Sequence, residues 1–296
     1  MQKIFAFSFL FMLAMTLLGG SFLFWEDKLF ITKIAQSATE EDLLELLFVG
    51  DIMLDRGVEA QIKKNNDWRW PFLKIVDTLQ KADLVFGNLE SQISDKGEKI
   101  GTIYSFQADP PAIDGLEYAG FDVLSTENNH NLDYGKEALD DSRRRLQIAG
   151  IATTPVTKTI EDTAISFLAY KQWGLGEAWK KEVQEATGDI IVVSIHAGEE
   201  YSKEPTIFQK NFAKDAIDAG ADLVIGHHPH VTQPVEQYKD GWIAYSLGNF
   251  VFDQDFSVET MQGLILKVLI EGKKIKEVIP LQTIINPSFQ VELRNP

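Results

Sequence analysis

The chain has 296 residues, no cysteine and a formal net charge of −16 at pH 7. Without cysteine there are no disulfides, no thiolate metal ligands and no lipid-modified cysteine anchor, so any metal must be held by oxygen and nitrogen atoms. The negative charge argues against a nucleic-acid partner, because phosphate binding requires surfaces rich in lysine and arginine.

Residues 1–25 are apolar and carry a single charged side chain, that of Lys3. Residues 4–25 are long enough for one membrane span, which takes about 20 residues. A cleaved signal peptide is the alternative, and residues 19–21 (Gly-Gly-Ser) offer a weak cleavage site, but apolar residues continue through Trp25. We therefore expect a single-pass membrane anchor with the rest of the chain on the extracytoplasmic side; cleavage would instead make the protein secreted.

The remainder divides into a polar stalk, residues 26–42, and one large domain, residues 43–296, with enough length for a substantial core. Apolar runs of strand length recur at Leu43–Val49, Asp83–Phe86, Val123–Ser125, Ala164–Tyr170, Ile190–Ile195, Leu223–Ile225, Trp242–Leu247, Gly263–Ile270 and Lys276–Ile279. Helical spacing is found at Trp70–Lys81, Pro111–Ala119, Lys136–Ala149 and Phe208–Ala219. Alternating strands and helices predict a layered α/β domain whose ligands bind beyond the strand ends.

Two acidic segments follow apolar runs. Asp51 is well placed to bind a cation, and Arg56 nearby can face an anionic substrate as a planar fork. Asn88 and Glu90 share a face if their strand continues, and a carboxylate between two metals is the usual way to hold cations about 4 Å apart. A turn aspartate with a surface arginine would also explain the first segment, and neither segment is decisive alone.

All five histidines fall in three segments, each beside or inside an apolar run. The first, residues 128–135 (Asn-Asn-His-Asn-Leu-Asp-Tyr-Gly), places amide side chains around His130. One amide oxygen can ligate a metal while His130 carries a proton, and Asp133 can accept from the ring and fix its tautomer. The alternative is an amide-rich turn that caps the following helix.

The other two histidine segments are more sharply placed. His196 ends the most β-branched run of the chain, although a lone histidine there is more often a core or loop residue. In Gly226–His230, three histidines in four residues are hard to explain by packing, and His228 and His230 can project towards two neighbouring metals. A serine–histidine–aspartate triad around Ser246 fits less well than a core strand whose end, at Asn249, borders the site.

Taken in order, the segments GDIMLDR, GNLE, ENNHNLDYG, SIHAGEEY, GHHPHVTQ and YSLGNFVFD resemble the CapA family, which is associated with poly-gamma-glutamate capsule synthesis. The resemblance runs from about Leu43 to Asp253. It implies a calcineurin-like metallophosphoesterase fold, a four-layer α/β/β/α sandwich with two divalent metal ions (Mn, Fe or Zn) at one edge.

The resemblance also implies a role for each matching residue. Asp51 and His230 would bind the first metal, Glu90 would bridge both, and the second would be held by Asn129, His196 and His228. His130 would protonate the leaving group, with Asp133 and Arg56 completing the catalytic set. Six further polar residues of these segments are predicted to contact substrate: Asn128, His227, Glu200, Tyr201, Gln233 and Asn249.

Two positions depart from the expected pattern. Phosphoesterases carry a histidine two residues after the first aspartate, and here that position is Met53, so the first metal site has one nitrogen ligand fewer than the pattern implies. Glu127 adds a charge where the family more usually has a small residue.

Two functions from different classes follow. One is a membrane-anchored, metal-dependent hydrolase acting on a phosphoester or an anionic polymer. The other is a non-catalytic accessory or export factor for poly-gamma-glutamate or a similar polymer, working with polyglutamate synthase subunits. Hydrolysis of the polymer's amide bonds is a third use of the same site. Substrate choice is expected to lie in the loops Ser91–Phe106 and Lys171–Thr187, where Trp173 and Trp179 either line a pocket or pack in the core.

Overall fold

The computed structural model describes residues 43–101 and 103–294. The predicted anchor, residues 1–25, and the predicted stalk, residues 26–42, lie outside this part of the chain. Among the residues it does describe, no helix combines the length and the apolar character needed to cross a membrane.

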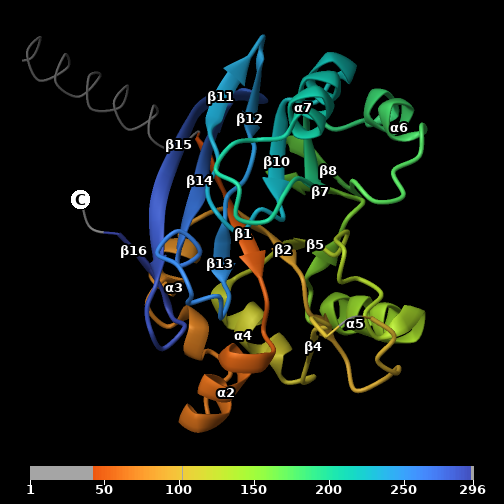
Figure 1. The fold of residues 1–296 in the computed structure, drawn as a ribbon. Coiled ribbons are helices and arrows are strands. Elements are labelled where there is room, and N and C mark those ends of the chain that lie inside the picture. Colours follow the sequence, from red (N-terminus) through yellow and green to blue (C-terminus); the bar gives the residue numbers. More distant parts are fainter. Residues whose placement is uncertain (1–42, 102, 295–296) are drawn as a thin grey trace, which may run out of the picture. The chain divides into compact units, whose positions relative to one another are not determined.

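Two mixed β-sheets form the centre of the domain (Figure 1). In the described residues the first sheet has eight strands, in the order β16 (Val291–Leu293), β15 (Lys274–Ile285), β14 (Gln262–Glu271), β1 (Leu44–Ile52), β2 (Leu84–Leu89), β5 (Val123–Ser125) and β6 (Ala152–Thr153), with β13 (Asn249–Val251) also paired to β1. The second has six, in the order β11 (Val235–Tyr238), β12 (Gly241–Ala244), β10 (Leu223–His227), β9 (Ile190–His196), β8 (Thr163–Lys171) and β7 (Val156–Ile160). A short pair, β3 (Gln92–Ile93) and β4 (Gln107–Ala108), lies outside both.

Helices cover the outer face of each sheet (Figure 1). On the first sheet these are α2 (Arg56–Asn65), α3 (Val76–Leu79), α4 (Ala112–Ala119) and α5 (Gly135–Ile148), with the 3-10 helix η1 (Trp70–Phe72). On the second they are α6 (Trp179–Glu185) and α7 (Ile207–Ala219). The predicted α/β class is therefore confirmed.

The alternation of side chains along β1 explains the layers. Leu46 and Phe48 point between the two sheets, whereas Leu47 and Val49 point towards the helices. Phe48 lies 6.5 Å, between ring centroids, from Phe167 of the second sheet. Each fully buried side chain of this size contributes roughly 1.5–3 kcal/mol, so this contact helps hold the sheets face to face.

Several predicted elements are corrected. The helix expected over Trp70–Lys81 is instead η1 followed by α3, because the first turn is tied elsewhere: the Trp70 indole donates to the Ser288 carbonyl at 2.8 Å. Helix α2 was not expected, although Asp55 caps it by accepting from the Arg56 amide. Helix α6 lies inside the segment Lys171–Thr187 that was expected to be a loop.

The end of β1 lies unusually close to the chain entering β13. The Asp51 amide donates to the Gly248 carbonyl at 2.9 Å, and Asp51 pairs in register with Asn249. A Cβ at Gly50 would lie 2.0 Å from the Gly248 oxygen. Only glycine at position 50 therefore permits the pairing that brings Asp51 beside Asn249.

We predict that Gly50→Ala destabilises the protein by about 1–3 kcal/mol or more, because the obstructing atom is backbone and cannot move aside. Urea unfolding measures the change. The matched control is Gly176→Ala, where an added Cβ meets nothing within 4 Å. Equal stability of the two variants would contradict the close approach.

Candidate metal centre

The chemically marked residues meet where strands of both sheets end. Asp51 is the second-last residue of β1, His196 is the last residue of β9 and His227 is the last residue of β10. Strands β9 and β10 are parallel and pair His196 with His227, while β1 and β2 are parallel and pair Asp51 with Asn88. The two carboxyl-terminal edges face each other, as the sequence pattern predicts for an α/β domain.

Asp51 forms the deepest part of the site and joins the two sheets. It is fully buried, and its Oδ1 accepts from Asn88 Nδ2 at 2.9 Å and lies 3.1 Å from His227 Nδ1. Its Oδ2 accepts from the His228 amide at 3.2 Å and lies 3.4 Å from His230 Nδ1. Burial alone would raise the Asp51 pKa, but the contacts with His227 and His230 outweigh it and hold that pKa well below its ordinary range. Asp51 is thus a carboxylate within the domain interior.

Glu90 provides the strongest indication of a bound cation. The residue is 1% exposed, and its Oε2 atom has no hydrogen-bond partner. Burial, followed by the charge of Asp51, raises the Glu90 pKa well above its ordinary value. An unpaired carboxylate is costly to bury unless a cation offsets it, and a divalent ion would reverse this local field. The donor set therefore fits a metal.

Asn129, His196 and His228 come together as predicted for a second metal. Asn129 Oδ1 lies 2.8 Å from His196 Nε2, and His228 Nδ1 lies 3.1 Å from the same nitrogen. Ligand atoms bound to one ion at about 2.0–2.2 Å are separated by about 3 Å, so these three atoms have the spacing of a shared ion. Burial, followed by the charge of His228, lowers the His196 pKa well below its ordinary value. The imidazole is then neutral, as metal binding requires.

The histidine turn after β10 has a specific backbone. His228 and His230 adopt positive φ angles, 96° and 58°, on either side of Pro229. A Cβ at Gly226 would lie 1.9 Å from the Tyr245 carbonyl oxygen, so the strand preceding the turn can approach its neighbour only with glycine there. Burial, then the charge of His230, lowers the His228 pKa to about 4.

His130 and Asp133 form the predicted proton-transfer pair. His130 Nδ1 lies 2.8 Å from Asp133 Oδ2, which also accepts from the Phe106 amide at 2.9 Å. The carboxylate therefore accepts a hydrogen bond from the Nδ1–H group, and Nε2 faces Asn129 Nδ2 at 3.2 Å. The Phe106 ring packs on the imidazole with 4.2 Å between centroids.

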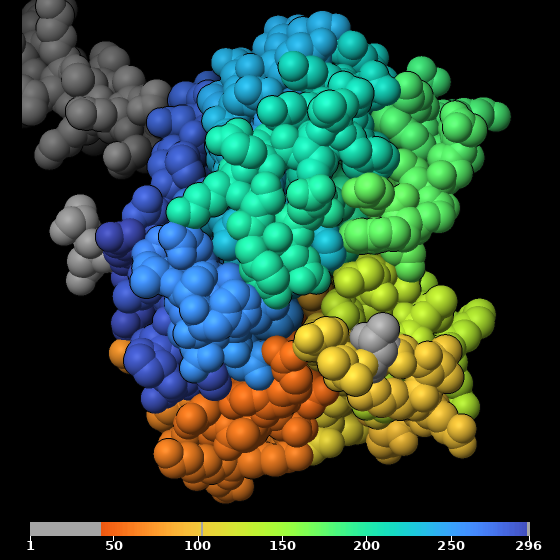
Figure 2. Space-filling view, viewed as in Figure 1, coloured from red at the N-terminus to blue at the C-terminus, as the bar shows by residue number. Residues whose placement is uncertain are grey.

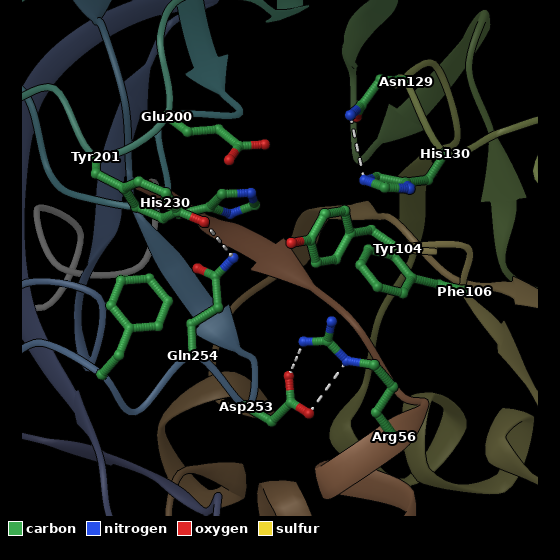
Figure 3. A pocket seen from close by; sticks show the side chains of 11 residues that line it. Arg56, Tyr104, Phe106, Asn129, His130, Glu200, Tyr201, His230, Asp253 and Gln254 are labelled. Atoms are coloured by element: carbon green, nitrogen blue, oxygen red, sulfur yellow. Dashed lines mark hydrogen bonds and ion pairs between the residues drawn. The ribbon is translucent and has the colours of Figure 1, made fainter. Parts of the chain in front are cut away.

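A cavity of 620 Å³ opens over these groups and is lined by Arg56, Tyr104, Phe106, Asn129, His130, Glu200, Tyr201, His230, Asp253, Gln254 and Phe256. Figure 3 shows Glu200, Tyr201 and His230 on one side and Asn129 and His130 on the other. Loops far apart in the sequence, around residues 100, 200 and 255, meet on this face (Figure 2). A second cavity of 620 Å³, lined in part by Lys171, Trp173 and His228, shares Asn129 and Glu200 with the first.

Arg56 lines the cavity, but its guanidinium is engaged. Its Nε donates to Asp253 Oδ2 at 3.2 Å, and its Nη2 forms an ion pair with the other carboxylate oxygen. The group also lies over the Phe106 ring, 4.8 Å from the centroid. Asp253 thus competes for the fork that was predicted to hold a substrate anion.

The residues predicted to contact substrate divide into two groups. Glu200 and Tyr201 line the cavity. Asn128, His227, Gln233 and Asn249 are buried beneath it, and their contacts indicate positioning roles. Asn128 Oδ1 accepts from the His130 amide at 3.1 Å, and Gln233 Nε2 donates to the Ser202 carbonyl at 2.8 Å.

His227 and Asn249 each hold a predicted ligand. His227 Nδ1 contacts Asp51, while its Nε2 is buried without a hydrogen-bond partner. Asn249 donates to the Thr260 carbonyl at 2.9 Å, so its Oδ1 is directed at His230 Nδ1, 3.0 Å away.

Some cavity residues carried no recognisable sequence signal. Tyr104, Phe256 and Gln254 reach the cavity from loops without a motif. Of the two tryptophans, Trp173 lies 4.8 Å from His228 between ring centroids, whereas Trp179 is buried 4.4 Å from Phe212. Trp173 is thus at the site and Trp179 belongs to the core.

The family model for the bacterial capsule synthesis protein PGA_cap matches residues 45–175 and 169–254, which include every predicted ligand. The chain belongs to this family. The predicted relationship is thereby confirmed. Capsule biosynthesis protein CapA of Bacillus anthracis is 30% identical over 280 residues, covering 82% of this chain and 68% of that protein. PGA biosynthesis protein CapA of Bacillus subtilis (strain 168) is 32% identical over 250 residues, covering 73% of this chain and 65% of that protein.

Solved structures share the fold of this PGA_cap chain at low sequence identity. A hypothetical protein from Thermus thermophilus gives a TM-score of 0.55 at 16% identity, covering 81% of this chain and 98% of that one. A novel phosphatase from Mycoplasma pneumoniae gives 0.51 at 13% identity, covering 82% of this chain and 94% of that one. The domain has an α/β metallophosphoesterase-like fold with two mixed sheets.

The two departures from the expected pattern have structural explanations in this PGA_cap chain. Met53 is fully buried in the apolar cluster beneath the helices, and its sulfur accepts from the Asp55 amide at 3.1 Å. Position 53 therefore takes part in the apolar packing and supplies no imidazole ligand. Glu127 is paired with Arg143 of α5 at 2.5 Å, so its extra charge is neutralised locally.

We predict that Mn²⁺ raises the melting temperature of this PGA_cap protein, because an ion that binds only the folded state adds about 2.7 kcal/mol at 100 times its Kd. Asn129→Ala should weaken Mn²⁺ binding about tenfold or more, as the loss of a ligand contact does. Differential scanning fluorimetry across an Mn²⁺ series measures both effects. Asn65→Ala, an exposed asparagine on α2, is the control. The absence of any shift with Mn²⁺, Fe²⁺ or Zn²⁺ would contradict a metal centre.

Proposed function

We propose that this protein is a membrane-anchored, extracytoplasmic, metal-dependent hydrolase of the phosphoesterase type, acting in the biosynthesis of poly-gamma-glutamate or another anionic surface polymer. One observation carries the proposal. The buried Glu90, whose Oε2 has no hydrogen-bond partner, clusters with Asp51 and His196, and the nearby cavity is lined by His130 of the His130–Asp133 pair. The polymer is suggested by the names of the two CapA relatives, and the anchor by residues 1–25.

The predicted ligands would hold two divalent cations, and the chemistry follows from their positions. When bound, the ions supply activated water and neutralise charge that develops on the reacting centre. They also reverse the field of an acidic site on a chain of net charge −16, which would otherwise repel an anionic substrate. The protein's own contribution is to fix the ligands through groups that are buried and hydrogen-bonded, such as Asn88 and Asn249.

His130 has the geometry of a general acid. Asp133 accepts a hydrogen bond from the Nδ1–H group, so Nε2 is the ring nitrogen presented to the cavity beside Asn129. In the cationic form, His130 gives its Nε2 proton to the leaving oxygen as the bond to that oxygen breaks. Phe106 packs on the ring and limits the access of water to it.

Asp133→Asn is expected to reduce kcat about 10²-fold on a phosphodiester with an alkyl leaving group. Asparagine no longer fixes the position of the proton on His130, and an alkoxide leaving group requires that proton in order to depart. The loss should be much smaller on a p-nitrophenyl ester, whose leaving group departs without protonation. Stopped assays on both esters with the Mn²⁺-loaded protein give the comparison, and Asp140→Asn, on the exposed face of α5, is the matched control.

Equal losses on the two esters would show that Asp133 only maintains structure. Activity on poly-gamma-glutamate but on neither ester would identify amide hydrolysis as the reaction of the same site.

A non-catalytic accessory or export role is the second candidate. Two observations favour it: position 53 supplies no ligand, and the Arg56 fork is occupied by Asp253. Such a protein would bind or guide the anionic polymer, together with polyglutamate synthase subunits, without turning it over.

An Asn129→Ala/His130→Ala chain separates the two candidates in cells that depend on this protein for polymer production. The hydrolase proposal predicts loss of polymer, or a changed polymer length, while the variant remains folded and in the membrane fraction. Normal polymer would support the accessory role. Asn65→Ala is the control, and protease access to the domain in intact protoplasts tests its extracytoplasmic location.

A further inference from the structure

The ion site that contains His230 has one protein ligand fewer than the phosphoesterase pattern predicts. Asp51, Glu90 and His230 remain, because position 53 holds a methionine that is packed in the apolar cluster. Three protein ligands can suffice for a catalytic ion, yet the structure places a further carboxylate against this site from a different loop.

Glu200 is that carboxylate. One oxygen of Glu200 and one nitrogen each of His228 and His230 lie within 4.8 Å of one another. Figure 3 shows the Glu200 carboxylate directed into the cavity on the same side as His230. In the described part of the chain, no lysine or arginine forms an ion pair with it.

The loop that carries Glu200 is fixed to the histidine turn. The Tyr201 amide donates to the Pro229 carbonyl at 2.7 Å, which ties the residue after Glu200 to the residue between His228 and His230. The Ala197 amide donates to the His227 carbonyl at 3.1 Å. Gly198, with φ of 115°, gives the loop its bend. These contacts hold Glu200 beside His228 and His230 without requiring an ion.

The His230 ring is held in place beside this carboxylate. Its Nδ1 lies 3.0 Å from Asn249 Oδ1 and 3.4 Å from Asp51 Oδ2. Contacts of this kind fix the orientation of metal-binding histidines.

We propose that Glu200 is a protein ligand of the ion bound by His230 and supplies the coordination that position 53 lacks. This assignment rests on the proposed metal centre. Both Glu199 and Glu200 are exposed and line the second cavity, but only Glu200 also lines the first cavity and lies in the cluster with His228 and His230, so the assignment makes Glu200 and not Glu199 a ligand.

Mn²⁺ binding to the purified full-length chain tests the assignment. Calorimetry gives the affinities, and elemental analysis after gel filtration gives the number of ions per chain. We expect wild type and Glu199→Gln to bind two ions with the same affinities. We expect Glu200→Gln to keep one ion and to bind the second at least about tenfold more weakly, with unchanged metal-free unfolding. Glu199→Gln removes the same charge one residue away and controls for long-range electrostatics.

Two results would overturn the role of Glu200 while leaving the metal centre intact: wild-type binding by Glu200→Gln, or equal weakening in both variants. A wild-type chain that binds no Mn²⁺ would instead refute the proposed function itself, and the assignment with it.

Discussion

The site depends on one buried carboxylate, that of Asp51, which joins the two sheets. It receives a hydrogen bond from Asn88 of its own sheet and from the His228 backbone amide beyond the second sheet. Because Gly50 allows β13 to approach, Asn249 also lies next to it. Any change in how the sheets pack would therefore move ligands from both sheets at once, so the apolar layer between them maintains the geometry of the centre.

Without a bound cation, the buried acidic groups at this edge of the sheets are electrostatically unfavourable. Asp51 and Glu90 are buried together, and the Oε2 atom of Glu90 has no partner. Burial also holds the pKa values of His196 and His228 low, which keeps these imidazoles neutral and able to donate a lone pair. A buried acidic pair with neutral histidines is costly without a cation and well suited to one. The same arrangement would let an acidic protein accept an anionic substrate.

The two candidate functions share this centre and differ in what surrounds it. The His130–Asp133 pair beside the cavity favours the proposed hydrolase, which would use it to protonate a leaving group. Conversely, Arg56 is held by Asp253, which weakens the case for a preformed anion clamp. The aromatic side chains at the rim, Tyr104, Tyr201 and Phe256, give the cavity a surface that neither function requires.

The sequence alone determined the α/β class, the family and the set of residues that meet at the strand ends, because apolar runs ending in Asp, Glu or His are local patterns. It did not show which polar residues reach the cavity. Asn128, Gln233 and Asn249 are predicted to contact substrate; they are buried, do not line the cavity and hydrogen-bond neighbouring residues of the site. The burial of Met53 in the apolar cluster, the pairing of Arg56 with Asp253 and the approach of Glu200 to His230 were decided by contacts between distant segments. Such contacts arise only when the sheets and loops pack together, so no pattern of neighbouring residues encodes them.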